Sequence, residues 1–78
     1  MIYYFSDPIQ NIKHEFWLSD NHPGYVKIVT YNEYSLGGQE WLHMIKNGKI
    51  IWRNDDFMRL SKEAKQYIQR IVGLIVFE

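Results

Sequence analysis

Cysteine is absent from the 78 residues of this chain, and that absence excludes several kinds of site. Disulfide bonds, thiolate metal centres and cysteine nucleophiles all require the missing thiol. A chain this short has a small core and often depends on additional stabilisation such as disulfide bonds, which are not possible here. Aromatic residues compensate, because they make up 17% of the chain and each of them buries about 150–250 Å² of surface.

An excess of charge of either sign is also missing, because 9 lysines and arginines balance 9 aspartates and glutamates. A protein that binds a polyanion usually carries a basic excess, so this balance disfavours nucleic acid as the main partner. It equally disfavours an acidic mimic of DNA. A protein with zero net charge tends to associate and precipitate, and a tightly bound partner would improve its solubility.

Long apolar runs and a basic leader are absent too. Residues 1–7 contain no positively charged stretch in front of an apolar one, which a signal peptide requires. No run reaches the roughly 20 apolar residues that a transmembrane helix needs. We therefore expect no membrane contact and a cytoplasmic location.

Catalytic and phosphate-binding motifs are missing from the sequence as well. The histidines His14, His22 and His43 lie in different segments and lack the spacing of metal ligands. We expect no metal site, no cofactor and no catalytic residues, and therefore a protein that is not an enzyme.

A strong hairpin signal is present in residues 39–53, where Asn47 and Gly48 separate two apolar runs. A type I′ turn needs a positive φ angle at both central residues, which asparagine and glycine adopt at little cost. This turn places Lys46 opposite Lys49. Side chains alternate between the two faces of a strand, so the register assigns every hairpin residue to a face.

Both faces of this hairpin are apolar. One face carries five ring or branched side chains, namely Trp41, His43, Ile45, Ile50 and Trp52. The other carries three apolar side chains, namely Leu42, Met44 and Ile51. A face exposed to water would alternate with polar residues, so each face requires a cover. What covers the second face is therefore the functional question.

Three further strands are predicted before the hairpin. Runs of β-forming residues, separated by clusters of turn residues, indicate strands at residues 2–5, 15–19 and 25–31.

After the hairpin the apolar spacing becomes helical. Residues 62–72 predict one amphipathic helix, with Asp55 or Ser61 as its N-cap. Gly73 fits the left-handed position that ends many helices. The apolar run at residues 74–77 then predicts a last, interior strand, which pairs either within the chain or across a dimer.

The predicted fold is a single α+β domain over residues 1–78, with the order β-β-β-β-β-α-β. It consists of a strongly bent, mostly antiparallel sheet of about five to six strands, with one amphipathic helix packed on one face. One helix of about three turns covers one face of such a sheet and leaves the other. The sheet must therefore curl on itself or offer its second face to a partner or a second copy.

An aromatic set is the candidate binding surface. Trp41, His43 and Trp52 share a face of the hairpin, and Tyr25 and Tyr31 can extend it from the neighbouring strand. Tryptophan and tyrosine dominate interface energetics, so the set fits a protein-binding hot spot. The alternative is that these rings form core beneath the helix, and the sequence leaves both interpretations open.

The favoured function is a non-enzymatic protein-binding module, a small inhibitor or regulator that presses its aromatic face or a strand edge onto a protein partner. An inhibitor encoded by a phage or mobile element would fit this description, and a homodimer would also cover the second face. The alternative is a nucleic-acid-binding module that uses the basic hairpin tip, Lys46, Lys49 and Arg53.

A small enzyme is the third and weakest hypothesis. Glu40 faces Asp55 in the hairpin register, and two carboxylates with His43 nearby could perform acid–base chemistry. Asp55 already suits a turn or a helix cap, which favours a structural role.

Overall fold

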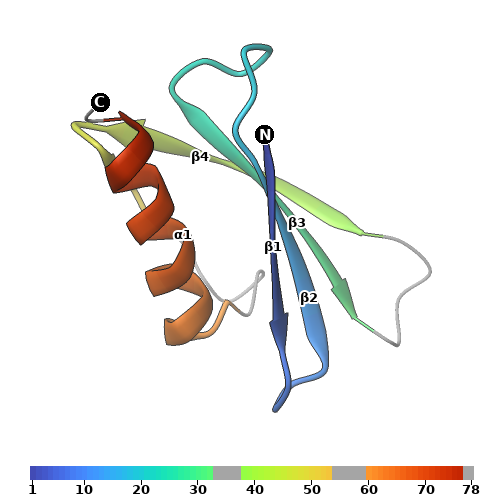
Figure 1. The fold of residues 1–78 in the computed structure, drawn as a ribbon. Helices are drawn as coiled ribbons and strands as arrows, with labels where there is room; N and C mark the ends of the chain where they lie inside the picture. Colours follow the sequence, from blue (N-terminus) through green and yellow to red (C-terminus); the bar gives the residue numbers. More distant parts are fainter. Residues whose placement is uncertain (33–37, 54–59, 77–78) are drawn as a thin grey trace.

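The computed structural model describes residues 1–32, 38–53 and 60–76 of the chain. They form five strands followed by one helix (Figure 1). In chain order the elements are β1 (Ile2–Asp7), β2 (Ile12–Trp17), β3 (Tyr25–Asn32), β4 (Gln39–Lys46), β5 (Lys49–Ile50) and α1 (Lys62–Val76).

The strands form one antiparallel sheet in the order β1-β2-β3-β4-β5. Short connections explain this meander, because tight turns can join antiparallel neighbours whereas parallel strands need long crossovers. The bent antiparallel sheet and the single helix confirm the predicted α+β fold.

The β4–β5 turn has the predicted geometry. Asn47 has a φ angle of 54° and Gly48 one of 75°, so both central residues adopt the left-handed conformation of a type I′ turn. The strand register on either side is the predicted one. It continues past β5, where the Ile51 amide donates to the Met44 carbonyl over 2.8 Å.

The β1–β2 turn is built on the Asp7 carboxylate. One of its oxygens accepts hydrogen bonds from the backbone amides of Ile9 at 2.9 Å and Gln10 at 3.1 Å. Asn11 then takes a φ of 54°, and pairing resumes at once. This tight turn explains why β2 begins at residue 12, earlier than the strand predicted at residues 15–19.

The sequence left two candidate caps for the helix, Asp55 and Ser61, and the structure shows that Ser61 caps α1. The Ser61 hydroxyl accepts a hydrogen bond from the Ala64 amide at 3.1 Å, which satisfies one of the free amides of the first turn. The apolar stripe of α1 is buried at Ala64, Ile68 and Val72. No helix in the described part of the chain is long and apolar enough to cross a membrane.

The predicted last strand at residues 74–77 is wrong, because α1 continues to Val76 and the sheet keeps five strands. A short apolar run is compatible with either a strand or a buried helical segment, and periodicity alone does not separate them. Gly73 therefore lies within the helix and does not end it. Phe77 lies outside the described residues.

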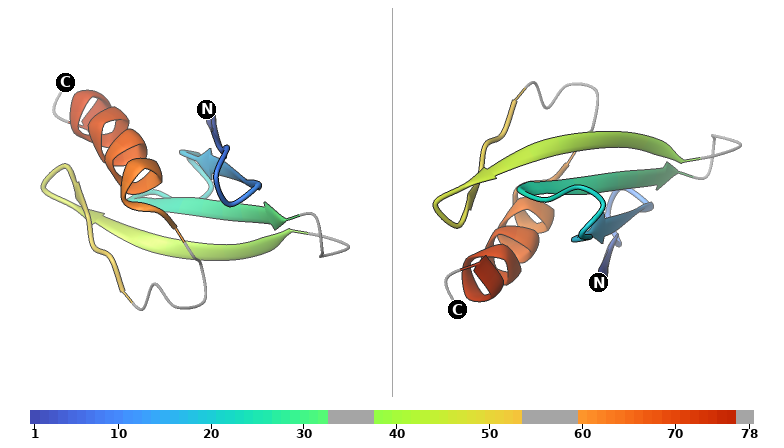
Figure 2. Two further views of the ribbon diagram at one scale, coloured as in Figure 1. Left: turned by 90° about the horizontal axis from the view of Figure 1, so that it is seen from below. Right: turned by 90° about the horizontal axis from the view of Figure 1, so that it is seen from above.

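The core lies between the sheet and the helix. Figure 2 shows the sheet bent around α1, which lies on its concave side. The sheet contributes Phe16, Val26 and Ile28 to this core, and the helix packs its buried stripe against them. The helix therefore covers the concave side of the sheet, and we call the opposite side the outer face.

A glutamine side chain from the helix closes one edge of the sheet. Oε1 of Gln69 accepts the Ile50 amide hydrogen at 2.8 Å, and its Nε2 donates to the Gly48 carbonyl at 3.0 Å. The side-chain amide has one donor and one acceptor group, as a backbone peptide has, and it takes the place of a neighbouring strand. The edge at β5 is thus tied to α1.

Candidate partner-binding surface

The outer face carries an apolar patch over β3, β4 and the residue that follows β5. It consists of four large side chains that are each 37% to 47% exposed, namely Tyr25, Leu42, Met44 and Ile51. The strand register pairs Tyr25 with Met44, and the Ile51 amide bonds to the Met44 carbonyl, so these side chains are neighbours. We call this set the outer patch.

A hollow of about 300 Å³ lies over the outer patch, with Arg53 at its rim. The Arg53 guanidinium donates a hydrogen bond of 2.7 Å to the Leu42 carbonyl, which fixes its position. A guanidinium has five donors, so those not used by Leu42 can bind a carboxylate or carbonyl on another molecule. The patch thus combines an apolar floor with a positioned cation.

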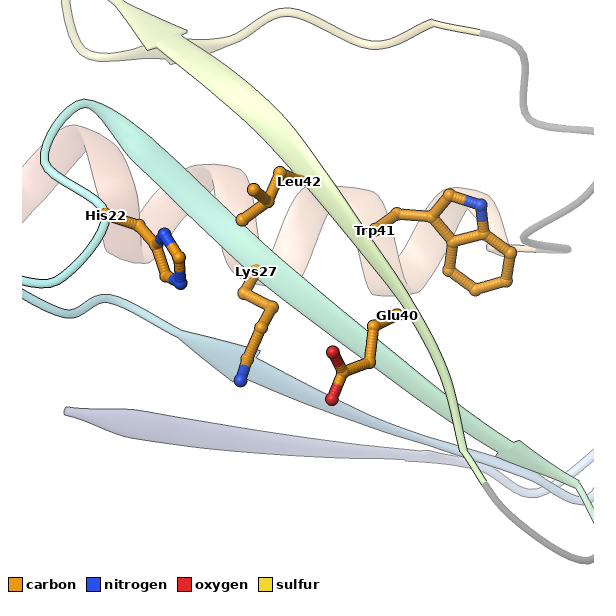
Figure 3. A pocket seen from close by; sticks show the side chains of 5 residues that line it. All are labelled: His22, Lys27, Glu40, Trp41 and Leu42. Carbon is orange, nitrogen blue, oxygen red and sulfur yellow. The ribbon is translucent and has the colours of Figure 1, made fainter.

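A second hollow of about 430 Å³ adjoins the first and shares Leu42 with it. Its other lining residues are His22, Lys27, Glu40 and Trp41. Figure 3 shows Lys27 and Glu40 on the same side of the sheet, and the ring of Trp41 set apart from them. The outer patch therefore has both a cationic and an anionic side chain beside it.

Lys27 is held in place by a neighbouring ring on the outer face. Its ammonium lies 4.3 Å from the centre of the Trp17 ring, within the range of a cation–π contact. Trp17 in turn donates from its indole nitrogen to the Glu15 carboxylate at 3.2 Å. These contacts reduce the side-chain freedom that a partner would otherwise have to restrict.

Tyr31 joins the same network from β3. Its hydroxyl donates to the Glu15 carboxylate at 3.4 Å. Partial burial, together with the Glu15 and Glu40 charges, raises the pKa of Tyr31, so its hydroxyl remains a donor at neutral pH. A Cβ atom on Gly38 would lie 2.8 Å from the Tyr31 ring, so only glycine allows the ring this position.

The aromatic residues singled out in the hairpin lie on the concave side. His43 is buried, and its ring centre lies 5.3 Å from that of Trp52. Trp41 and Trp52 are half-buried against the core. The three residues share one face as predicted, and this face is the one that α1 covers.

Tyr25 and Tyr31 do not extend that face, and this expectation is corrected by the β3–β4 register. Ile28 pairs with Trp41, so the even-numbered residues of β3 share the face of Trp41. Tyr25 and Tyr31 are odd-numbered and point to the outer face. A shift of one residue in register exchanges the faces, and the sequence of residues 33–38 contains no Asn-Gly signal from which to predict the register.

The three cations of the predicted basic tip are divided between two places. Lys46 and Lys49 are exposed and pair across the β4–β5 turn. Arg53 lies apart from them, at the rim of the outer patch.

The sequence predicts Leu42, Met44 and Ile51 on the second face of the hairpin but does not mark them as a binding surface. Their sequence signal was sufficient, because the Asn47–Gly48 turn already placed them together. The sequence did not indicate that α1 covers the other face.

A polar cluster is buried under the start of α1. Nδ1 of His14 lies 3.0 Å from the Thr30 hydroxyl, while its Nε2 has no hydrogen-bond partner among the described residues. Burial lowers the pKa of His14 to about 4, against the opposing effect of the Asp7 charge. Backbone amides and the Ser61 hydroxyl lower the pKa of Asp7. His14 is only 1% exposed, so this cluster is shielded from solvent.

The other predicted chemistry is dispersed. His22 lies in the β2–β3 connection and His43 is buried under α1, while Asp55 lies outside the described residues. Within residues 1–32, 38–53 and 60–76, no group of three or more potential metal-ligating side chains comes together.

Comparisons of the chain with protein-family models, with curated proteins and with solved structures found no match.

Proposed function

We propose that this protein is a non-enzymatic binding module, a small inhibitor or regulator that docks its outer patch on a protein partner. The observation that carries the proposal is the outer patch itself: four large apolar side chains lie side by side and exposed, opposite the face that α1 covers. Contiguous exposed apolar patches mark interaction sites more often than isolated apolar residues do.

The surroundings of the outer patch support the same function. Protein interfaces commonly have an apolar centre surrounded by polar groups that confer specificity. Here Arg53, Lys27 and Glu40 supply those groups next to Leu42. Burial of the apolar centre would favour binding by about 25 cal/mol for each Å² removed from water, before the entropic cost of association.

A charge placed at the centre of the patch tests the proposal. In Met44→Asp the carboxylate would have to be desolvated on binding, so we expect the affinity for the partner to fall by about thirtyfold or more, as at an interface hot spot. The matched control is Leu74→Asp, because Leu74 is also a large exposed apolar residue but lies on α1. The wild type and both variants serve as baits in extract of the source cells, after circular dichroism has shown that all three are folded.

The supporting result is a protein that wild type and Leu74→Asp retain and Met44→Asp loses, with its affinity then measured by calorimetry. Capture of the same proteins by all three baits would contradict the proposal.

A nucleic-acid-binding module is the second candidate, and a separate hollow of about 450 Å³ favours it. This hollow lies between Trp52 and α1, and among the described residues its lining includes Lys65 and Arg70 but no acidic residue. An aromatic ring beside cations is typical of surfaces that bind single strands. However, the Lys65 ammonium lies 5.6 Å from the centre of the Trp52 ring and would compete with a stacked base.

The salt dependence of binding tests this candidate. Affinity for a single-stranded oligonucleotide should fall steeply as salt rises, because phosphate contacts release counterions. Arg70→Gln should reduce this slope, whereas Lys13→Gln, on the distant strand β2, serves as the matched control. Absence of binding at low salt would exclude the candidate.

A further inference from the structure

The two edges of the sheet are unequal. At one end β5 is bonded to Gln69 of α1, while at the other end β1 has a single strand neighbour, β2. Among the described residues, no segment pairs with the second edge of β1.

The hydrogen-bond pattern identifies the groups that face this open edge. Met1 and Leu18 exchange two backbone hydrogen bonds, of 2.8 Å and 2.9 Å, where the start of β1 lies beside the end of β2. In an antiparallel ladder bonded pairs alternate with non-bonded ones, so Tyr3 and Phe5 also bond toward β2. The amides and carbonyls of the intervening residues, Ile2, Tyr4 and Ser6, therefore point to the open edge.

Residues 2–6 lack the features that usually block an edge strand. They contain no charged residue and no proline, and their pairing with β2 is regular without a bulge. Lysines, prolines and bulges at an edge prevent the addition of another strand. Three donors and three acceptors at regular spacing are thus available to an extended backbone.

The side chains beside the edge define what such a strand would meet. On the concave side, Tyr3 and Phe5 are half-buried, and the Phe5 ring centre lies 5.4 Å from that of Tyr67 on α1. On the outer face, Ile2 and Tyr4 are 36% and 63% exposed. Both flanks are apolar or aromatic and uncharged.

We propose that the open edge of β1 accepts an extended segment of a protein partner as a sixth strand, with uncharged, β-branched or aromatic side chains at alternate positions. Backbone hydrogen bonds to Ile2, Tyr4 and Ser6 hold the segment, and its alternate side chains contact the two flanks. A second copy suits this edge less well, because α1 stands on the concave side near β1 and a paired copy would bring its own helix to that side (Figures 1 and 2). This contact is separate from the outer patch.

A strand-forming peptide tests the edge directly. The probe is an acetylated and amidated peptide of alternating valine and threonine, with one lysine at each end. In the free protein we expect fast amide exchange at Ile2, Tyr4 and Ser6 and slow exchange at Tyr3 and Phe5. Excess peptide should slow the three outward amides by about tenfold or more, as new backbone hydrogen bonds protect them.

A proline substitution provides the matched control. Tyr4→Pro removes an amide that points away from β2, and proline is tolerated at such edge positions, so the variant should fold and lose the effect of the peptide. Ser6→Pro removes a second outward amide and replaces Tyr4→Pro if that variant does not fold. Met44→Asp should respond to the peptide as wild type does, which separates this contact from the outer patch.

Two results would overturn the proposal. One is unchanged exchange at Ile2, Tyr4 and Ser6 in excess peptide. The other is a mass of two copies by light scattering that Tyr4→Pro reduces to one, because the edge would then belong to a second copy of the chain.

Discussion

The two sides of strand β4 have similar apolar composition and different environments. His43 on the concave side is buried under α1, whereas its neighbours Leu42 and Met44 on the outer side are exposed. The difference arises from a distant element, since the helix that covers one side begins at residue 62. Apolar side chains on both sides of a strand therefore indicate that each side needs to be covered. They do not indicate whether another segment of the same chain covers it.

The largest loss of stability is expected from a substitution on the concave side of the sheet, which α1 covers. Phe16→Ala removes a fully buried ring between the sheet and α1, and should lower the free energy of unfolding by about 3–5 kcal/mol. Urea denaturation followed by tryptophan emission measures this change. A loss below about 1 kcal/mol would mean that α1 does not pack on this side as described.

Acid should weaken the same side through His14. Its pKa is near 4 in the folded chain and 6.5 in its ordinary state, so the unfolded chain takes up the proton first. The contribution is fully present above pH 6.5 and is lost as the pH falls to about 4, in total roughly 3 kcal/mol. The lowered pKa of Asp7 acts in the same direction at still lower pH.

Urea unfolding across this pH range measures the effect, with His14→Gln as the comparison. The variant should lose most of the pH dependence between pH 6.5 and 4, whatever its stability at neutral pH. His22→Gln is the matched control, because His22 lies in the β2–β3 connection and outside the buried cluster of His14. An unchanged profile in His14→Gln would contradict the assignment.

A smaller loss of stability is expected at the β5 edge of the sheet, where Gln69 joins α1 to the hairpin. Gln69→Ala removes both hydrogen bonds to the β4–β5 hairpin and should cost about 1–3 kcal/mol, because the Ile50 amide and the Gly48 carbonyl lose their partner. Gln66→Ala changes the same residue type on the exposed side of α1 and should cost much less. Equal losses in the two variants, measured by thermal unfolding, would count against the edge bond.

The smallest effect should occur on the outer side. Met44→Gln replaces an exposed side chain with one of similar length, and should change the free energy of unfolding by no more than about 0.5 kcal/mol. A larger loss of unfolding free energy, measured by urea denaturation, would show that the outer patch is part of the hydrophobic core. A stable variant with impaired partner binding would instead separate the two sides of β4 by function.

Local signals predicted the fold well. Asn47 and Gly48 set a turn whose geometry depends on two residues, and the faces of the hairpin followed from it. The stripe of Ala64, Ile68 and Val72 likewise predicted the helix from its own spacing. The run that begins at Leu74 was misread, because four apolar residues suit a strand as well as the last turn of a helix.

The candidate surface depended on information that is not local. The faces of Tyr25 and Tyr31 depend on the register between β3 and β4, and the sequence that joins these strands carries no Asn-Gly signal that would fix it. The burial of Trp41 and Trp52 depends on which side α1 takes. Composition identified the aromatic and apolar residues that matter, but only the packing of the helix separated the covered set from the exposed one.

The bond between Gln69 and the hairpin also has a consequence for the order of folding. β5 has only two residues, so it gains little from pairing with β4 until the amide of Gln69 reaches its other side. The β4–β5 pairing is local too, but β5 has only this short contact with β4 and also depends on a residue 19 positions beyond Ile50. We therefore expect the first four strands to form early and the C-terminal third to close as one unit. Pulse-labelled hydrogen exchange should show the Ile50 amide gaining protection together with α1, after the amides of β2 and β3.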